Sequence, residues 1–296
     1  MIAELQSGPT VDKRANLSHE ELVSRYVERR LPVVIQDGTR HWRGMGKITP
    51  DYLRKKYGHL SKRVDGRDYT VAEVSELIQT STPENPAPYP FNLNVEHYFP
   101  ELLEEFSPDI VFGRSDRIKH PLLPGFLLSG TQTYELFMGG YGSRFPYLHV
   151  DLLALDTQIT QLHGTKEFIL YPPDQTPYLY PFPDNPLRSQ VNIFEPDLEK
   201  FPNFRKAVAT RVRVEPGESI LFPTGWWHTT QIHGPSISFG RVHVNRANWN
   251  AFVDENFALW RRNGHSWMLS HAARLYSQVL GNLMNLQEQL LPGRPA

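Results

Sequence analysis

The residue types best suited to chemistry are two histidines and an aspartate that come from distant parts of the chain. His149-Val150-Asp151 places an imidazole and a carboxylate two residues apart, and His228 closes the much later stretch Pro223-Thr-Gly-Trp-Trp-His. Two imidazoles and one carboxylate can occupy one face of a ferrous ion, which leaves three coordination positions open for a keto-acid cosubstrate and O2. The spacing therefore predicts a non-haem iron centre on His149, Asp151 and His228.

The first stretch is weak evidence alone, because a His-x-Asp pair is common on surface loops. In an extended segment His149 and Asp151 would point to the same face, since alternate residues of a strand share a side. A buried carboxylate also needs a partner, and a cation is one way to supply it. The pair becomes informative only when a second imidazole joins it.

The second imidazole comes from a stretch with a clear pattern of turns and strands. Residues 214–228 read as turn, strand, turn and strand, with His228 at the start of the last strand. His228 can therefore face the same interior as His149. His233 and His243 are the alternative third ligands, and His243 lies in an alternating segment that could also turn it inward.

A cosubstrate of the 2-oxoglutarate type needs a cation for its distal carboxylate. Lys166 opens a β-type segment shortly after the His-Asp pair, and an ammonium is a suitable point-charge partner for a carboxylate. Arg241, on a late segment, is the rival cation. Tyr134 and Thr160 are candidate hydroxyl partners, although core or surface roles are more common for such residues.

Composition narrows the possible classes of protein. The chain has 296 residues and no cysteine, so a metal must be held by histidines and carboxylates. The net charge is −1, which makes a nucleic-acid partner unexpected. The sequence contains neither a long apolar run nor an apolar leader, so we expect no membrane association and a cytoplasmic location.

The pattern along the chain predicts a mainly β fold with flanking helices, namely a double-stranded β-helix of the jelly-roll, cupin-like kind. Helical and strand elements are expected in residues 1–122, the barrel in 123–247 with a Pro- and aromatic-rich insert at about 172–206, and helices in 248–296. Residues 1–16 are expected to be loose. Short strands are expected at 132–138, 147–155, 157–162, 166–171, 211–214, 218–222, 227–232 and 236–244.

The N-terminal part also carries helix signals. Ser18 to Glu21 reads as a capping box that opens a helix, Thr49 precedes a helix that Gly58 ends, and residues 70–79 form a third helix.

An apolar stripe runs along the expected C-terminal helix. Five residues recur at helical spacing on one face. They either pack on the barrel or form the interface of a homodimer. The stripe consists of Leu275, Val279, Leu283, Leu286 and Leu290.

These features together resemble a known family, the JmjC-type, cupin-like 2-oxoglutarate oxygenases. The resemblance is strongest to the small protein hydroxylases akin to the asparaginyl hydroxylase that inhibits hypoxia-inducible factor, and it covers roughly residues 18–245. The matching motifs are His149-Val-Asp151, Gly164-Thr-Lys166 running into Ile-Leu-Tyr-Pro-Pro173, Pro216-Gly217 through Trp226-Trp-His228, Arg30-Leu-Pro-Val-Val-Ile35, Thr49-Pro-Asp-Tyr-Leu53 and Asn94 to Leu103.

The resemblance implies Fe(II) on His149, Asp151 and His228, with the distal carboxylate of 2-oxoglutarate on Lys166. It implies consumption of O2 and hydroxylation of a substrate C–H bond. Two features depart from the family. The interval from Asp151 to Lys166 is about two residues longer than usual, and a threonine that commonly precedes the first histidine is missing from residues 143–149. A register shift could therefore pass the carboxylate to Arg241.

The expected function is a hydroxylase, that is, a 2-oxoglutarate-dependent dioxygenase, that acts on an amino-acid side chain in a protein or peptide. A hydroxylase of a small molecule, such as a free amino acid or a biosynthetic intermediate, is the alternative. An open groove beside the iron would favour a peptide, and a pocket closed by the insert would favour a small molecule. A hydroxylase of an RNA base and a non-catalytic cupin binding module are further alternatives; the apparently intact triad argues against the last.

Overall fold

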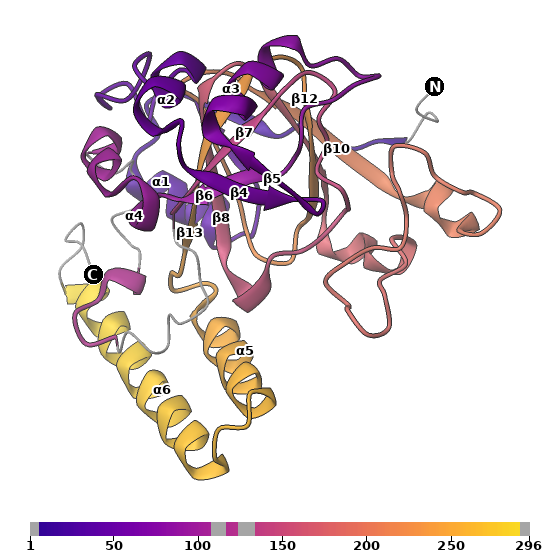
Figure 1. The fold of residues 1–296 in the computed structure, drawn as a ribbon. Coiled ribbons are helices and arrows are strands. Elements are labelled where there is room, and N and C mark those ends of the chain that lie inside the picture. Colours follow the sequence, from indigo (N-terminus) through magenta and orange to yellow (C-terminus); the bar gives the residue numbers. More distant parts are fainter. Residues whose placement is uncertain (1–5, 108–116, 124–133, 291–296) are drawn as a thin grey trace.

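The computed structural model describes residues 6–107, 117–123 and 134–290, and shows two large β-sheets and a two-stranded one, with helices around them (Figure 1). The larger sheet has seven strands in the order β2-β3-β11-β8-β13-β7-β6. The smaller sheet has four strands in the order β1-β10-β9-β12. The strands of the larger sheet are β2 (Asp12–Arg14), β3 (Val33–Ile35), β6 (Phe91–Asn94), β7 (Tyr134–Gly139), β8 (Asp156–His163), β11 (Ser219–Phe222) and β13 (Ser236–His243). Those of the smaller sheet are β1 (Gln6–Ser7), β9 (Lys166–Tyr171), β10 (Val208–Val214) and β12 (Trp227–Ile232).

The two sheets pack against each other through apolar side chains. Phe168 and Leu170 of β9 share a buried cluster with Ile220 and Phe222 of β11. Burial of such side chains contributes roughly 1.5–3 kcal/mol each. The expected mainly β fold with flanking helices is therefore confirmed, and most of the expected strands lie within a few residues of their predicted bounds.

The N-terminal helices begin where their capping residues predict. In α1 (His19–Leu22) Ser18 and Glu21 form the expected capping box, and the helix continues as a π-helical turn, Val23–Val27. Helix α2 (Pro50–Tyr57) is capped by Thr49, and α3 (Val71–Thr80) has a second capping box. The chain then forms α4 (Val95–Tyr98) and a 3-10 helix, Pro100–Phe106.

Three strands and a hairpin in the N-terminal part were not expected. Residues 12–14 pair with β3 and residues 6–7 pair with β10, so the expectation of a loose start was wrong for these residues. The hairpin consists of β4 (Ser61–Val64) and β5 (Arg67–Thr70), joined by Asp65-Gly66 with both φ angles positive. That turn type favours Asp-Gly, because both residues adopt left-handed conformations. Strand β6 extends the larger sheet next to β7.

The expected strand at 147–155 is only partly present. His149 forms isolated bridges, but Leu152–Ala154 is a 3-10 turn in which Leu153 and Ala154 have left-handed backbone conformations. A left-handed residue cannot continue a strand. The prediction of a continuous strand was therefore wrong after Asp151.

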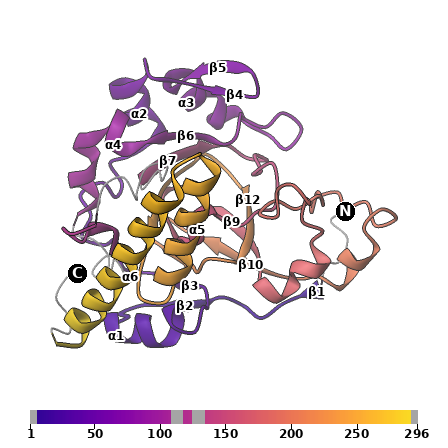
Figure 2. The ribbon, with the colours of Figure 1, turned by 90° about the horizontal axis from the view of Figure 1, so that it is seen from below.

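Two helices close the described chain, α5 (Trp249–Arg262) and α6 (Trp267–Leu290). They pack on each other and lie over one end of the two-sheet core (Figure 2). Gly281 is required at their contact, because a Cβ there would lie 2.2 Å from Nε1 of Trp249. None of the helices in the described ranges combines the length and the apolar character that a membrane span needs.

The apolar stripe of α6 does not pack on the barrel. Its five residues, Leu275, Val279, Leu283, Leu286 and Leu290, are between 40% and 77% exposed. Helix α5 instead covers a different face of α6, which contains Leu280 and Met284. The first of the two alternatives for the stripe is therefore wrong.

Candidate metal and cosubstrate site

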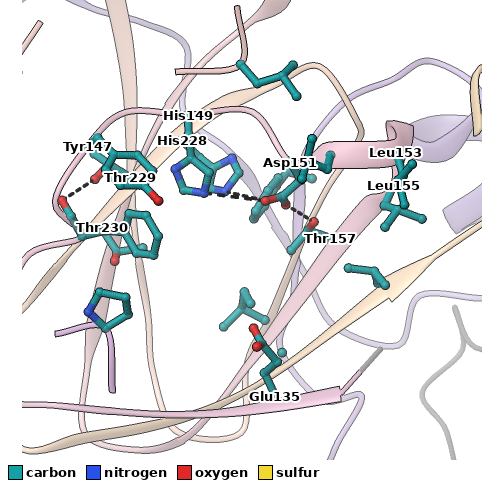
Figure 3. A pocket seen from close by; sticks show the side chains of 18 of the residues that line it. Glu135, Tyr147, His149, Asp151, Leu153, Leu155, Thr157, His228, Thr229 and Thr230 are labelled. Atoms are coloured by element: carbon teal, nitrogen blue, oxygen red, sulfur yellow. Dashed lines mark hydrogen bonds and ion pairs between the residues drawn. The ribbon is translucent and has the colours of Figure 1, made fainter. Parts of the chain in front are cut away.

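His149 and His228 are fixed side by side by their own backbone. The N–H of His149 donates to the carbonyl of His228 at 3.1 Å, and the N–H of His228 donates to the carbonyl of His149 at 2.8 Å. Asp151 follows in extended conformation, and its Oδ1 lies 3.6 Å from Nε2 of each histidine. One ligand atom from each of the three residues lies within 4.8 Å of the others (Figure 3).

The stretch before His228 is anchored on both flanks. The indole Nε1 of Trp226 donates to the carbonyl of Arg30, and that of Trp227 donates to Oγ1 of Thr176 in the insert. These two indole hydrogen bonds fix the backbone before His228, whose side chain lines the cavity between the sheets. The turn itself is held by Asp156, whose buried carboxylate accepts from the N–H of Thr224 at 2.8 Å.

The donor set fits a divalent transition metal. Nδ1 of His228 lies 3.1 Å from the carbonyl oxygen of Trp226, which favours a proton on Nδ1 and leaves Nε2 as the ligand atom. Burial, and then the neighbouring His228, lower the pKa of His149, which keeps its imidazole neutral as a ligand must be. Burial raises the pKa of Asp151, but the two histidines and a hydrogen bond from Thr157 outweigh that effect and lower it overall.

The alternative third ligands lie elsewhere. Nε2 of His233 contacts Oε2 of Glu167 at 3.3 Å, and Nε2 of His243 contacts Oε1 of Gln158 at 2.9 Å. Of the three candidates, only His228 joins the group that could hold a metal in the described part of the chain.

The three residues line a cavity of about 810 Å³ between the sheets. This is large enough for a cosubstrate and part of a substrate. Its walls come from both sheets, from residues 184–187 of the insert and from helix α5.

Lys166 is the cation buried in this cavity. It begins β9, is 2% exposed, and its Nζ donates to Oγ of Ser238 across the two sheets. Burial lowers the pKa of Lys166 to about 7. No carboxylate of the described residues forms an ion pair with this ammonium, so an anionic ligand would supply the missing charge.

A tyrosine lies next to Lys166, and a threonine lines the same cavity. The Nζ atom lies 5.6 Å from the ring centre of Tyr89, and burial raises the pKa of that phenol to about 12. Thr230 lies two residues after His228 on β12, in the strand next to β9, and its buried hydroxyl lines the cavity. Tyr89 and Thr230 were not predicted, although the two-residue spacing from His228 is a signal that could have identified Thr230.

The two predicted hydroxyl partners are not brought to the cavity. Thr157 and Ile159 occupy the face of β8 that borders the cavity. Thr160 lies on the opposite face of β8, and its Oγ1 is 2.6 Å from Oγ of Ser219. Tyr134 stacks on Phe239, with ring centres 5.8 Å apart, among the residues under the N-terminal helices. Alternation along each strand turns these two side chains into buried layers away from the cavity.

Arg241 borders the cavity but is directed toward another layer. Its guanidinium carbon lies 5.2 Å from the ring centre of Tyr134. By strand alternation the side chains of Gly240 and Val242 share one face of β13 and that of Arg241 takes the other, although all three residues line part of the cavity wall. Lys166 is therefore the better placed of the two cations.

The insert forms part of the site as well as part of its wall. The N–H of Val150 donates to the carbonyl of Leu187, and the N–H of Ser189 donates to that of Leu148, both at 2.9 Å. His149 thus lies between β12 on one side and residues 187–189 on the other. The insert also contains two 3-10 helices, Pro173–Tyr178 and Pro202–Lys206.

The comparisons with known proteins agree with this architecture. Residues 19–249 match the model of the family described as "Cupin-like domain". The chain is 34% identical over 138 residues to human HSPB1-associated protein 1, which covers 45% of this chain and 27% of that protein. It is 26% identical over 242 residues to Lysine-specific demethylase 8 of Xenopus tropicalis, with coverage of 77% and 51%, respectively.

A third relative is Arginine-specific demethylase JMJ22 of Arabidopsis thaliana, at 23% identity over 263 residues, which covers 84% of this chain and 50% of that protein. The chain thus spans between about a quarter and a half of the length of these curated relatives. The family match extends over most of the chain and includes all strands of both sheets except β1 and β2, and all three candidate metal ligands. This chain belongs to the cupin-like domain family.

Proposed function

We propose that the chain is an Fe(II)- and 2-oxoglutarate-dependent oxygenase that hydroxylates a C–H bond. The observation that carries the proposal is the presence, in one cavity, of a donor set of two histidines and one carboxylate and of a buried ammonium that no described carboxylate pairs. The first group suits Fe(II), and the second suits the distal carboxylate of 2-oxoglutarate.

His149, Asp151 and His228 would hold the iron, and Lys166 would hold the distal carboxylate with help from Thr230. Bound iron would supply the oxidative chemistry, in which O2 and 2-oxoglutarate give succinate and CO2 while one oxygen atom enters the substrate C–H bond. The chain contributes orientation and exclusion of water. Thr157 fixes the carboxylate of Asp151 through its hydrogen bond, and the stacked ring of Phe145, 4.5 Å from that of His149, limits the movement of the imidazole.

The proposed substrate is an amino-acid side chain in a protein or peptide. Relatives named lysine-specific and arginine-specific demethylases support this class, because these names place their action on amino-acid side chains. One observation favours the alternative, a small-molecule substrate. Residues 184–187 of the insert and residues of α5 both line the cavity, so the two could enclose a small ligand between them.

The test of the reaction is release of succinate with iron, 2-oxoglutarate and O2. Wild-type protein should release succinate slowly without substrate and faster with the correct one, and His149→Ala should release none above the level without protein. Mass spectrometry of candidate peptides and metabolites should then find a product heavier by one oxygen atom. Succinate release that persists unchanged in His149→Ala would contradict the proposal.

We further propose that the chain forms a homodimer through the exposed stripe of α6. The helix has 24 residues and a length of roughly 36 Å. Its two charged residues are both occupied within the chain, since Arg274 pairs with Asp254 and Glu288 pairs with Arg117. The stripe itself is uncharged and apolar, so a second copy of the same face would bury it without leaving an unpaired charge.

A further inference from the structure

Glu135 directs a carboxylate into the cavity, from the wall opposite the metal site. It is the second residue of β7 and lines the cavity, and Figure 3 shows its side chain across the open space from His149 and His228. Its partner in the neighbouring strand is Gly240, which has no side chain to cover the carboxylate.

The carboxylate is held in place by a short relay of polar groups. Nδ2 of Asn92 donates to Oε1 of Glu135 at 2.7 Å, and Nζ of Lys62 donates to Oδ1 of Asn92. The relay orients Glu135 but brings no cation into contact with it. Among the described residues, the only hydrogen bond on this carboxylate is the one that Oε1 of Glu135 accepts, which leaves Oε2 without one. This oxygen therefore remains available to a ligand in the cavity.

The positive charges near the cavity are placed elsewhere. Lys166 donates to Ser238, Arg241 lies over Tyr134, and Arg262 on α5 is exposed. Another carboxylate in the wall, that of Glu255, differs from Glu135 because it accepts hydrogen bonds from the backbone of Ala154 and Leu153.

An ionised carboxylate in a largely enclosed site is costly unless a cation pairs with it. Burial, followed by the charge of Asp151, raises the pKa of Glu135, while Asn92 and Lys62 oppose the rise. A positively charged group entering the cavity would remove this cost and gain a charge-assisted hydrogen bond.

We propose that Glu135 is a specificity-determining residue that binds a positively charged group of the substrate, an ammonium or a guanidinium, across the cavity from the metal. This inference rests on the proposed function and narrows its substrate to basic side chains or amines. Because Asn92 holds one oxygen, the other presents a single directed acceptor to the incoming cation.

The test compares charged and neutral probes of nearly equal shape. The protein is loaded with Mn(II), which does not turn over, and with 2-oxoglutarate. Binding of N-acetyl-arginine methylamide and of its uncharged counterpart N-acetyl-citrulline methylamide is then measured from the relaxation of probe protons near the manganese. N-acetyl-lysine methylamide and its norleucine counterpart form a second pair.

In wild-type protein, at least one charged probe should bind about tenfold or more tightly than its neutral counterpart, the gain of one charge-assisted hydrogen bond. Glu135→Gln preserves the shape and an acceptor for Asn92, so it should keep the fold and bring the ratio close to one. Glu104→Gln, the same exchange at an exposed carboxylate that does not line the cavity, is the matched control and should leave the ratio within about twofold.

Three results would overturn the inference: equal affinity for charged and neutral probes in wild-type protein, a ratio unchanged in Glu135→Gln, or no binding of any probe to loaded protein. Failure of the wild-type protein to bind Mn(II) and 2-oxoglutarate is measured separately. Such a failure would contradict the proposed function and therefore this inference as well.

Discussion

His149 and His228 exchange both of their main-chain hydrogen bonds, at 3.1 and 2.8 Å, although they lie in distant parts of the chain. The spacing of the two imidazoles is therefore set by the backbone, and the side chains can be changed without removing the contact that joins the segments. Variants at the site should consequently report on ligand binding rather than on folding.

Replacing His228 with alanine should reduce Mn(II) affinity by at least about 100-fold, because loss of a direct ligand exceeds the usual 10- to 100-fold effect of a supporting residue. Isothermal titration calorimetry would measure the change. His233→Ala is the control, since that imidazole contacts Glu167 away from the cavity. Affinity in His228→Ala within threefold of wild type would refute its assignment as a ligand.

The affinity for 2-oxoglutarate should depend on pH through Lys166. The pKa of Lys166 is lowered to about 7, so raising the pH above that value deprotonates the unliganded amine and removes the charge that attracts the carboxylate. The apparent dissociation constant should rise roughly tenfold per pH unit above 7, until the pKa of the complex is reached. Titration of the Mn(II)-loaded protein between pH 6 and 9 would show it.

Two variants at the same position separate this charge effect from other causes. Lys166→Arg stays protonated throughout this range, so its affinity should be weaker but nearly independent of pH. Lys166→Met should bind weakly at every pH. A wild-type affinity that does not change from pH 6 to 9 would argue against an ammonium–carboxylate contact.

Thr230 and Thr160 offer a matched pair of hydroxyls. Thr230 of the smaller sheet lines the cavity, whereas Thr160 of the larger sheet lies on a strand face away from it. Thr230→Val should weaken 2-oxoglutarate binding about 5- to 10-fold, through loss of one hydrogen bond to a charged group. Thr160→Val should leave that affinity unchanged and instead lower the free energy of unfolding by about 1–2 kcal/mol, because Gln158 and Ser219 lose a buried partner. Competition binding and urea unfolding measure the two effects, and the opposite pattern would reassign the hydroxyl.

The α6 stripe should govern the oligomeric state. Val279→Lys combined with Leu286→Lys should convert a dimer into a monomer, since two copies would place like charges in one apolar contact. Light scattering coupled to size exclusion measures the mass. Leu77→Lys is the control, because Leu77 is also exposed but lies on α3. A monomeric wild-type protein, or a double variant with the wild-type mass, would contradict the dimer.

Local signals in the sequence were sufficient for several elements. Ser18 and Thr49 mark helix starts through side-chain bonds to nearby backbone, and residues 166–171 form a strand with the predicted bounds. Such features depend on neighbours in the chain, so a single sequence can reveal them. The His149, Asp151 and His228 group was likewise brought together as expected, because its strand and turn patterns are strong.

Features that depend on tertiary register were harder to predict. The candidate hydroxyls of Thr160 and Tyr134 lie on strand faces away from the cavity, and the sequence did not fix which face each would take, because a shift of one residue in register reverses every side chain. The turn after Asp151 could not be inferred either, since Leu153 and Ala154 adopt left-handed conformations that packing against α5 must support. No local sequence pattern marks Glu135 as a binding residue. Its proposed role depends on the hydrogen bond from Asn92 and on its position in the cavity wall, and both are tertiary features.

The pairing of residues 187–189 with residues 148–150 ties the position of the insert to that of the proposed metal site. A hinged flap could swing away without disturbing the reaction centre, but here the flap and a ligand-bearing segment share hydrogen bonds. Outward movement of the insert would break these hydrogen bonds and let His149 move, which would lower the affinity for a metal at the proposed site. A protease cut within the insert should therefore weaken metal binding before it unfolds the protein.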